Sequence, residues 1–296
     1  MPVRPDGALP ADSHVHSEWS WDAPYGSMVR SCERAQALGI PAIAFTEHVD
    51  HDAWRIAMDE LEPDDHLARL SRDGLLHPPP LDAEGYLAAV AECRSRFPGL
   101  TILTGVELGE PHRHPQQVAA VLATGDFDRR LGSLHALLDG DEYAEPPGLF
   151  PHRDAHDVMV DYLRETTALA GSDAPFDILA HIDYPVRNWP VAAGHFDPAD
   201  FEEHFREALR ALAGSGRALE LNTRVPLHHA ILRWWRDVGG DAISFGSDAH
   251  TPEAVANGFA DAVELAQAHG FRAGRTAYDV WTLAPGQAVG STPDSL

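Results

Sequence analysis

The sequence predicts an α/β fold in which parallel strands, each followed by a helix, close into a seven-stranded barrel. Short apolar segments rich in β-prone residues alternate seven times with longer segments of helical periodicity. Such alternation is typical of a parallel sheet with right-handed crossovers, and the length of 296 residues suits one closed barrel. We therefore expect the active site at the carboxyl ends of the strands, where barrels of this class build their sites.

Each predicted element is recognised from its local pattern. The strands are expected in segments 7–16, 40–48, 100–108, 127–135, 176–183, 217–223 and 241–250. The helices are expected at about 27–38, 84–96, 114–123, 154–170, 200–213, 228–238 and 252–269. Residues 50–82 and 139–153 are rich in Asp, Pro and Gly, so they are predicted to be long loops over one barrel face. Residues 1–284 would form one domain, and 285–296 a mobile tail.

The composition excludes several classes of function. A formal net charge of -24 disfavours binding to nucleic acid or anionic lipid. No apolar run approaches the roughly 20 residues of a membrane span, and the N-terminus lacks a signal-like apolar segment, so we expect a cytoplasmic location. Cys32 and Cys93 are far apart and are expected to be buried thiols. All 22 basic residues are arginines, which excludes Schiff-base lysine chemistry, a Walker A lysine and a carbamylated-lysine metal bridge.

Residues that can bind metal ions recur at the ends of the predicted strands. They are His14 and His16 on the first strand, His48 on the second, Glu107 on the third, His135 on the fourth, His181 on the fifth, and Asp248 and His250 on the seventh. Because the carboxyl ends of parallel barrel strands converge on one face, we expect these side chains to meet there.

Each of these residues alone has a structural explanation. A single histidine near a strand end is more often hydrogen-bonded than metal-bound, and strand alternation puts both histidines of an H-x-H pair on one face in many metal-free proteins. Two spaced pairs and four single residues, all at strand ends, argue against a purely structural role. Of the other histidines, His152 and His156 are expected at the surface, and His228 and His229 at the pocket rim.

The motifs at these strand ends resemble the PHP (polymerase and histidinol phosphatase) superfamily across about residues 9–270. They are H-x-H, "TEH", "GVELG", "GSLH", "AHID" and "GSDAH". The resemblance implies a distorted (β/α)7 barrel that holds three divalent metal ions, zinc, iron or manganese. It implies one metal held by His14, His16, Glu107 and Asp248, and a second, bridged by Glu107, held by His135 and His181. The third would be held by His48, His250 and Asp22.

The resemblance also implies the chemistry, which is metal-assisted hydrolysis of a phosphomonoester. Arg187 and Arg224 resemble the arginines with which the histidinol-phosphate phosphatase branch grips phosphate, and guanidinium groups suit phosphate oxygens. The alternative is that both arginines pair with nearby carboxylates. Asp183, two residues after His181, is a candidate for orienting a ligand or relaying a proton to the leaving group.

The substrate implied by the resemblance is L-histidinol phosphate, a small phosphate ester that also carries cationic groups. The predicted 50–82 loop begins directly after His48 and would supply acidic and aromatic groups at the rim, carried by Asp50, His51, Asp52, Trp54, Asp59 and Glu60. A nucleotide or sugar phosphate is the alternative substrate class, and a non-catalytic metal-binding module is the alternative function. Amidohydrolases share H-x-H at the first strand, but the fourth strand here ends in histidine and lysine is absent. The oligomeric state stays open.

Overall fold

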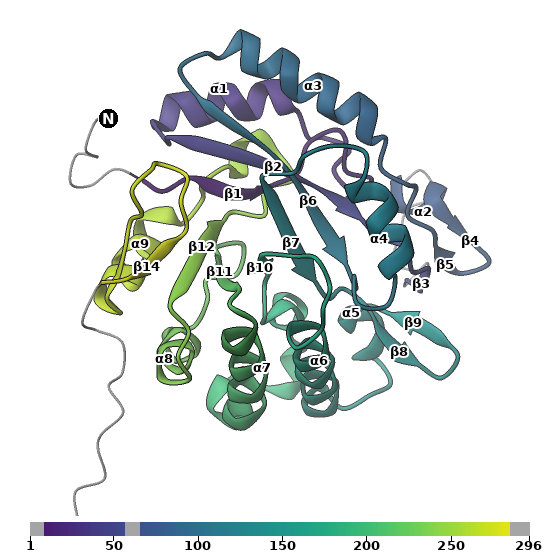
Figure 1. Cartoon of the computed structure of the whole chain (residues 1–296). Helices are drawn as coiled ribbons and strands as arrows, with labels where there is room; N and C mark the ends of the chain where they lie inside the picture. The colour runs from purple at the N-terminus through teal and green to yellow at the C-terminus, as the bar shows by residue number, and fades with distance from the viewer. Residues whose placement is uncertain (1–8, 57–65, 285–296) are drawn as a thin grey trace, which may run out of the picture.

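The computed structural model describes residues 9–56 and 66–284 (Figure 1). All seven predicted parallel strands are present and lie side by side in chain order. They are β1 Asp12–Val15, β2 Ala42–Val49, β6 Thr101–Gly109, β7 Arg129–Ser133, β10 Ile178–Leu179, β11 Ala218–Asn222 and β12 Ala242–Gly246. The predicted α/β fold is therefore confirmed, with a curled parallel sheet at its centre.

In the described part of the chain, the two outer parallel strands of the sheet, β1 and β12, meet at their carboxyl ends. Val15, at the end of β1, bridges to Ala249, just beyond β12, and the His16 amide donates to the Ala249 carbonyl at 2.8 Å. At its start, β12 instead pairs antiparallel with β14 Trp281–Leu283, which in turn pairs with β13 Phe271–Arg272. This C-terminal pair was not predicted. It separates β1 from the start of β12, so the barrel is distorted and its closed end is the end that carries the candidate ligands.

The helices lie outside the curled sheet, as Figure 1 shows. The seven predicted helices correspond to α1 Met28–Leu38, α3 Ala83–Arg96, α4 Pro115–Leu122, α6 Ala155–Ala170, α7 Glu202–Ser215, α8 His229–Asp237 and α9 Phe259–Ala268. Helix α8 illustrates how they bind the sheet, because Trp234 and Trp235 on its inner face are buried in the core. Among the described residues, no helix is long and apolar enough to cross a membrane.

The two segments expected to be long loops contain a second sheet instead. Its order is β4-β5-β3-β9-β8. The strands are β3 Trp54–Arg55, β4 Ser71–Arg72, β5 Leu75–Leu76, β8 Leu137–Asp139 and β9 Glu142–Ala144, with short helices α2 His66–Leu70 and α5 Pro146–Leu149. Trp54 on β3 pairs with Tyr143 on β9. The two segments are far apart in the chain, and this pairing lets their backbone groups form hydrogen bonds with each other. The expected 285–296 tail lies outside the described residues.

The connection after β10 is made of short 3-10 helices. They are η2 Tyr184–Asn188, η3 Val191–Ala193 and η4 Pro198–Phe201, and a further one, η5 Pro252–Ala254, follows β12. The first of them begins three residues after His181 and therefore brings Tyr184 and Arg187 to the same barrel face as the strand-end histidines.

Candidate metal centre and active site

The nine side chains predicted as metal ligands meet at the carboxyl ends of the strands. They form four overlapping groups of donors whose ligand atoms lie within 4.8 Å of one another. The groups are His16, Asp22, His48 and His250; His14, His181 and Asp248; His14, His16 and Glu107; and His48, Glu107 and His135. His181 and Asp248 hold positive φ angles of 21° and 53°, a backbone conformation that non-glycine residues adopt at a cost and that clusters at functional sites.

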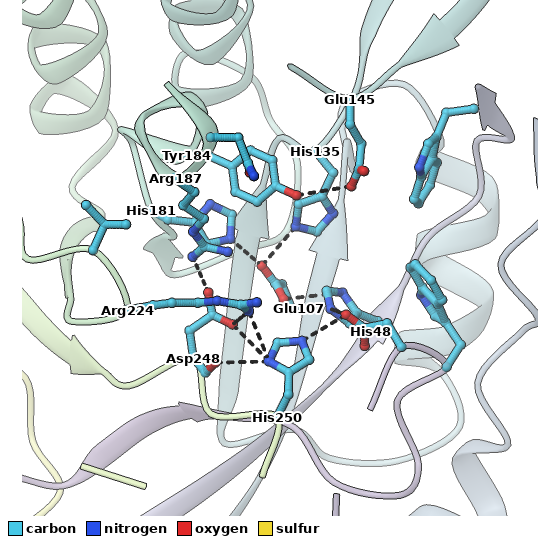
Figure 2. Close-up of a pocket in the computed structure, with 15 residues that line it drawn as sticks. His48, Glu107, His135, Glu145, His181, Tyr184, Arg187, Arg224, Asp248 and His250 are labelled. Carbon is cyan, nitrogen blue, oxygen red and sulfur yellow. Dashed lines mark hydrogen bonds and ion pairs between the residues drawn. The ribbon is translucent and has the colours of Figure 1, made fainter. Parts of the chain in front are cut away.

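Glu107 lies at the middle of the cluster, as Figure 2 shows. Its Oε1 atom lies 2.7 Å from Nε2 of His181 and 3.2 Å from Nε2 of His135. Its Oε2 atom lies 3.1 Å from Nε2 of His14 and 3.2 Å from Nε2 of His16. One carboxylate thus contacts histidines on both of its sides, which is the arrangement a bridging ligand needs.

A further group lies at the outer side of His16. Oδ2 of Asp22 lies 2.8 Å from Nε2 of His250 and 3.3 Å from Nε2 of His48. The His16 ring lies between the other two imidazoles, with ring centroids 4.3 Å from His48 and 4.3 Å from His250. Asp22, His48 and His250 are therefore together, as the resemblance implied, and His16 lies close enough to join them.

The outward-facing nitrogens of two histidines are held by buried carboxylates. Nδ1 of His14 lies 2.6 Å from Oε1 of Glu220, and Nδ1 of His135 lies 3.1 Å from Oδ1 of Asp50. A carboxylate on Nδ1 keeps the proton there, so Nε2 is left with its lone pair facing the cluster. Such carboxylate–histidine pairs orient metal ligands in many proteins.

Two glycines at strand ends make room for these carboxylates. A Cβ atom at Gly246, at the end of β12, would overlap Oε1 of Glu220, and one at Gly109, at the end of β6, would overlap Oδ1 of Asp50. Each glycine is therefore required by the close approach of a side chain and not by its own backbone angle.

The buried charges perturb one another strongly. Burial opposes ionisation of Glu107, but the imidazoles of His14 and His48 outweigh it and hold its pKa well below the usual range. Burial likewise disfavours the charged form of His14, but the carboxylates of Glu220 and Glu107 raise its pKa well above 6.5. Burial and neighbouring imidazoles lower the pKa of His16 to about 3. The carboxylates that attract a proton to His14 would equally attract a metal cation.

The donor set fits divalent metal ions. Nε2 of His14 lies 3.0 Å from Nε2 of His16, and both nitrogens lie close to the carboxylate of Glu107. These three groups could bind one cation together. Two further buried atoms of the cluster have no hydrogen-bond partner: Oδ1 of Asp22 and Nδ1 of His181. Imidazole and carboxylate ligands suit zinc, iron and manganese. Both the chemistry of the donors and these unpaired atoms agree with metal binding.

A cavity of about 360 Å³ opens above the cluster, and both predicted arginines line it. Arg187 donates a hydrogen bond to Oδ2 of Asp248 and lies 4.7 Å above the Tyr184 ring. Nη1 of Arg224 lies 3.5 Å from Oδ1 of Asp248 and 3.2 Å from Nδ1 of His250. Each arginine thus pairs with a carboxylate, the alternative considered above, and also faces the cavity, where it could contact an anion.

The structure corrects the expected role of Asp50 as a substrate contact at the rim. Asp50 is buried behind the cluster, where it binds His135 and accepts a hydrogen bond of 2.8 Å from Nε1 of Trp21. The reason is strand alternation, since residues 48 and 50 point to the same side and Asp50 follows His48 inward. Trp54, in contrast, does line the cavity. Asp59 and Glu60, also expected near the rim, lie outside the described residues.

Asp183, a candidate for proton relay, and Asp52, expected at the rim, also lie outside the cavity lining. Asp183 is not among the described residues that line the cavity; it is buried, which raises its pKa to about 6 against the effect of Arg187. Asp52 binds Nη1 of Arg113 at 3.2 Å and Nε2 of His114 at 2.9 Å, away from the cavity.

His228 and His229, expected at the pocket rim, line a separate cavity of about 380 Å³ between the start of α8 and α9. They contribute nothing to the metal cluster.

Glu145 and Tyr184 are functional-site residues that no sequence motif predicted. Both line the cavity, and the Tyr184 hydroxyl lies 3.1 Å from Oε1 of Glu145 (Figure 2). Burial raises the pKa of the Glu145 carboxyl. Glu145 belongs to a segment with no motif, and the pairing of β3 with β9 directly before it brings it to the cavity. Glu220 was also missed, although a glutamate within the apolar strand "ALELN" is a signal that could have found it.

The chain is similar in sequence to proteins named histidinol-phosphatase. A probable histidinol-phosphatase of Deinococcus radiodurans is 28% identical over 271 residues, which cover 86% of this chain and 91% of the relative. A histidinol-phosphatase of Lactococcus lactis is 25% identical over 247 residues, covering 81% and 83%.

Two solved structures share the fold. A histidinol phosphate phosphatase of Lactococcus lactis, complexed with zinc, L-histidinol and phosphate, has a TM-score of 0.72 at 22% identity and covers 90% of this chain and 95% of that one. A putative histidinol phosphatase of Listeria monocytogenes has a TM-score of 0.65 at 15% identity, covering 85% and 99%. The PHP domain model matches residues 12–224, and the chain therefore belongs to the PHP domain family.

Proposed function

We propose that this protein is a metal-dependent phosphomonoester hydrolase whose substrate is L-histidinol phosphate. The observation that carries the proposal is a cavity lined by seven of the nine metal-capable side chains, by two arginines and by a glutamate. Metal ions at the base and arginines beside them would receive a phosphate group, and the glutamate would receive a cation. Relatives named histidinol-phosphatase support this proposal.

Three divalent ions are proposed for the cluster, with Glu107 as the ligand shared between two of them. Its two oxygens face His181 and His135 on one side and His14 and His16 on the other. Asp22, His48 and His250 would hold the third ion. When bound, such ions would neutralise phosphate charge and lower the pKa of a water molecule, so that hydrolysis proceeds near neutral pH.

The arginines are proposed to hold the phosphate. Arg187 is 13% exposed and Arg224 is 48% exposed, so Arg187 has little competition from water and Arg224 can move toward an incoming group. Both donate to Asp248 in the structure, and phosphate oxygens would take over some of these hydrogen bonds. The arginines would then orient phosphorus over the metal ligands and stabilise the charge that develops on the equatorial oxygens.

Glu145 is proposed to select the alcohol part of the substrate. Its carboxylate lines the same cavity as the indole rings of Trp21 and Trp54, whose centroids are 5.8 Å apart. An imidazole or ammonium group would find a negative charge and aromatic surface there, whereas a nucleotide or sugar phosphate offers no cation to pair with Glu145. This arrangement favours histidinol phosphate over the alternative substrate class.

A non-catalytic metal-binding module is the other candidate function. The cavity argues against it, because a module that only binds metal has no need for arginines and a glutamate around an open space of substrate size. The cytoplasmic location stays a prediction.

Phosphate release from histidinol phosphate, measured beside a panel of nucleoside monophosphates and sugar phosphates, tests the proposal. Metal content should be determined on the same sample. Preferred turnover of histidinol phosphate that depends on metal would support it; preference for another ester would keep the phosphatase chemistry and reject the substrate. Absence of turnover in the metal-loaded protein would favour the non-catalytic module.

A further inference from the structure

His16 is held differently from His14 and His135, whose Nδ1 atoms contact carboxylates directly. Its Nδ1 atom contacts no carboxylate and instead lies 2.9 Å from the hydroxyl oxygen of Ser20. That hydroxyl lies 2.6 Å from Oε2 of Glu47, and all three side chains are buried. Glu47 directly precedes His48 on β2 and, by strand alternation, points to the opposite side of the strand.

The hydrogen bonds around Ser20 determine which way its proton points. A serine hydroxyl has one proton and two lone pairs. The carboxylate of Glu47 can only accept, so the Ser20 proton is donated to it. The Ser20 oxygen then accepts from the backbone amide of His48 at 3.1 Å, which leaves one lone pair for His16. Nδ1 of His16 must therefore carry the proton that completes this bond.

We infer that Glu47 acts through Ser20 as a positioning pair that fixes the tautomer of His16, so that its Nε2 lone pair faces the proposed metal centre. This inference deepens the proposed function and rests on the proposed metal centre. Glu47 and Ser20 act on His16 and not on the substrate. Glu220 holds Nδ1 of His14 directly, whereas Glu47 holds Nδ1 of His16 through the hydroxyl of Ser20. The need for an intermediary follows from the location of Glu47 on the far side of β2.

Replacement of either residue should release His16 from this tautomer. In Ser20→Ala the acceptor for Nδ1 is lost. In Glu47→Gln the side-chain amide can donate to Ser20, whose hydroxyl is then free to donate to Nδ1 of His16 and drive the proton to Nε2. Both variants should bind zinc about 10–100-fold more weakly, the range measured when partners of metal-bound histidines are removed.

Ser17→Ala is the matched control. The Ser17 hydroxyl donates to Oε1 of the same Glu47 at 2.5 Å, so its loss removes an equally buried hydrogen bond while the Ser20 contact to His16 stays. If Glu47 only braces the segment after β1, Ser17→Ala and Ser20→Ala should lower the melting temperature alike and leave zinc affinity unchanged. We instead expect weaker zinc binding in Ser20→Ala but not in Ser17→Ala, with affinity restored in Ser20→Thr, which keeps a hydroxyl.

The experiment combines zinc affinity, by competition with a chelator, with nitrogen-15 NMR of the imidazole rings in the metal-free protein. His16 is assigned by the signal lost in His16→Gln. The wild type should carry the His16 proton on Nδ1, and Ser20→Ala and Glu47→Gln should shift it toward Nε2. A wild-type proton on Nε2, or equal zinc affinity in Ser17→Ala and Ser20→Ala, would overturn the inference. Failure of the wild type to bind zinc would reject the proposed function instead, while the NMR result would still decide the tautomer.

Discussion

Glu107 and His181 are joined by a contact of 2.7 Å between Oε1 and Nε2, while the other oxygen of Glu107 faces His14. One carboxylate from β6 therefore reaches candidate ligands on β1 and just beyond β10, strands that lie on either side of β6 in the sheet. This relationship makes Glu107 the residue on which most of the proposed centre depends.

Glu107→Gln should therefore remove more than one metal ion. Glutamine keeps the size of the side chain but offers one neutral oxygen, so it cannot serve two ions. We expect bound zinc to fall by about two ions per chain, measured by elemental analysis after reconstitution, with catalytic turnover lost. A variant with unchanged metal content and activity would show that Glu107 is not a shared ligand.

Truncation of the arginines should weaken catalysis. Arg187→Ala and Arg224→Ala should each lower kcat/KM by roughly 10–150-fold. This corresponds to a loss of about 1.5–3 kcal/mol of transition-state stabilisation, the range for hydrogen bonds to a charged group. The larger effect is expected for Arg187, because its side chain is the more buried of the two. Arg210→Ala, which breaks only an exposed pair with Glu203, is the control. If kcat/KM were unchanged in both Arg187→Ala and Arg224→Ala, the two arginines would serve only as ion-pair partners of Asp248.

The binding of the cationic substrate should depend on the ionisation of Glu145. Burial raises the pKa of this carboxyl, and only its ionised form attracts a cation. KM for histidinol phosphate should therefore fall as the pH rises through the Glu145 pKa. In Glu145→Gln this dependence should vanish, so the ratio of the variant KM to the wild-type KM should increase with pH. Comparison at each pH cancels the titration of the substrate itself; a ratio that stays constant would remove Glu145 from substrate selection.

Asp50→Asn should impair metal binding and leave substrate selection intact. An asparagine amide can donate to Nδ1 of His135, which would move the imidazole proton to the nitrogen that faces Glu107. Zinc affinity should fall by about 10–100-fold. Asp52→Asn is the control, since Asp52 binds Arg113 and His114 away from the cavity. A changed KM for the cationic substrate with normal zinc affinity would restore Asp50 to the rim.

The barrel and the nine candidate ligands could be predicted from the sequence, whereas the residues that form the cavity walls could not. His135 and His181 could be located because each follows an apolar run whose carboxyl end must face the same side of a parallel barrel. Glu145 could not, because its place depends on the pairing of Trp54 with Tyr143, and two-residue strands leave no periodic pattern. Asp50 was misplaced because nearness to His48 in sequence was taken for exposure, although alternation already placed both on one side.

The most direct test of the account is the ratio of kcat/KM values, from phosphate release by the zinc-loaded protein, for histidinol phosphate and for a nucleoside monophosphate. We expect a ratio of at least about 10 in favour of histidinol phosphate, equivalent to about 1.4 kcal/mol of discrimination. The ratio should fall toward one in Glu145→Gln. A wild-type ratio of one or below would contradict the account.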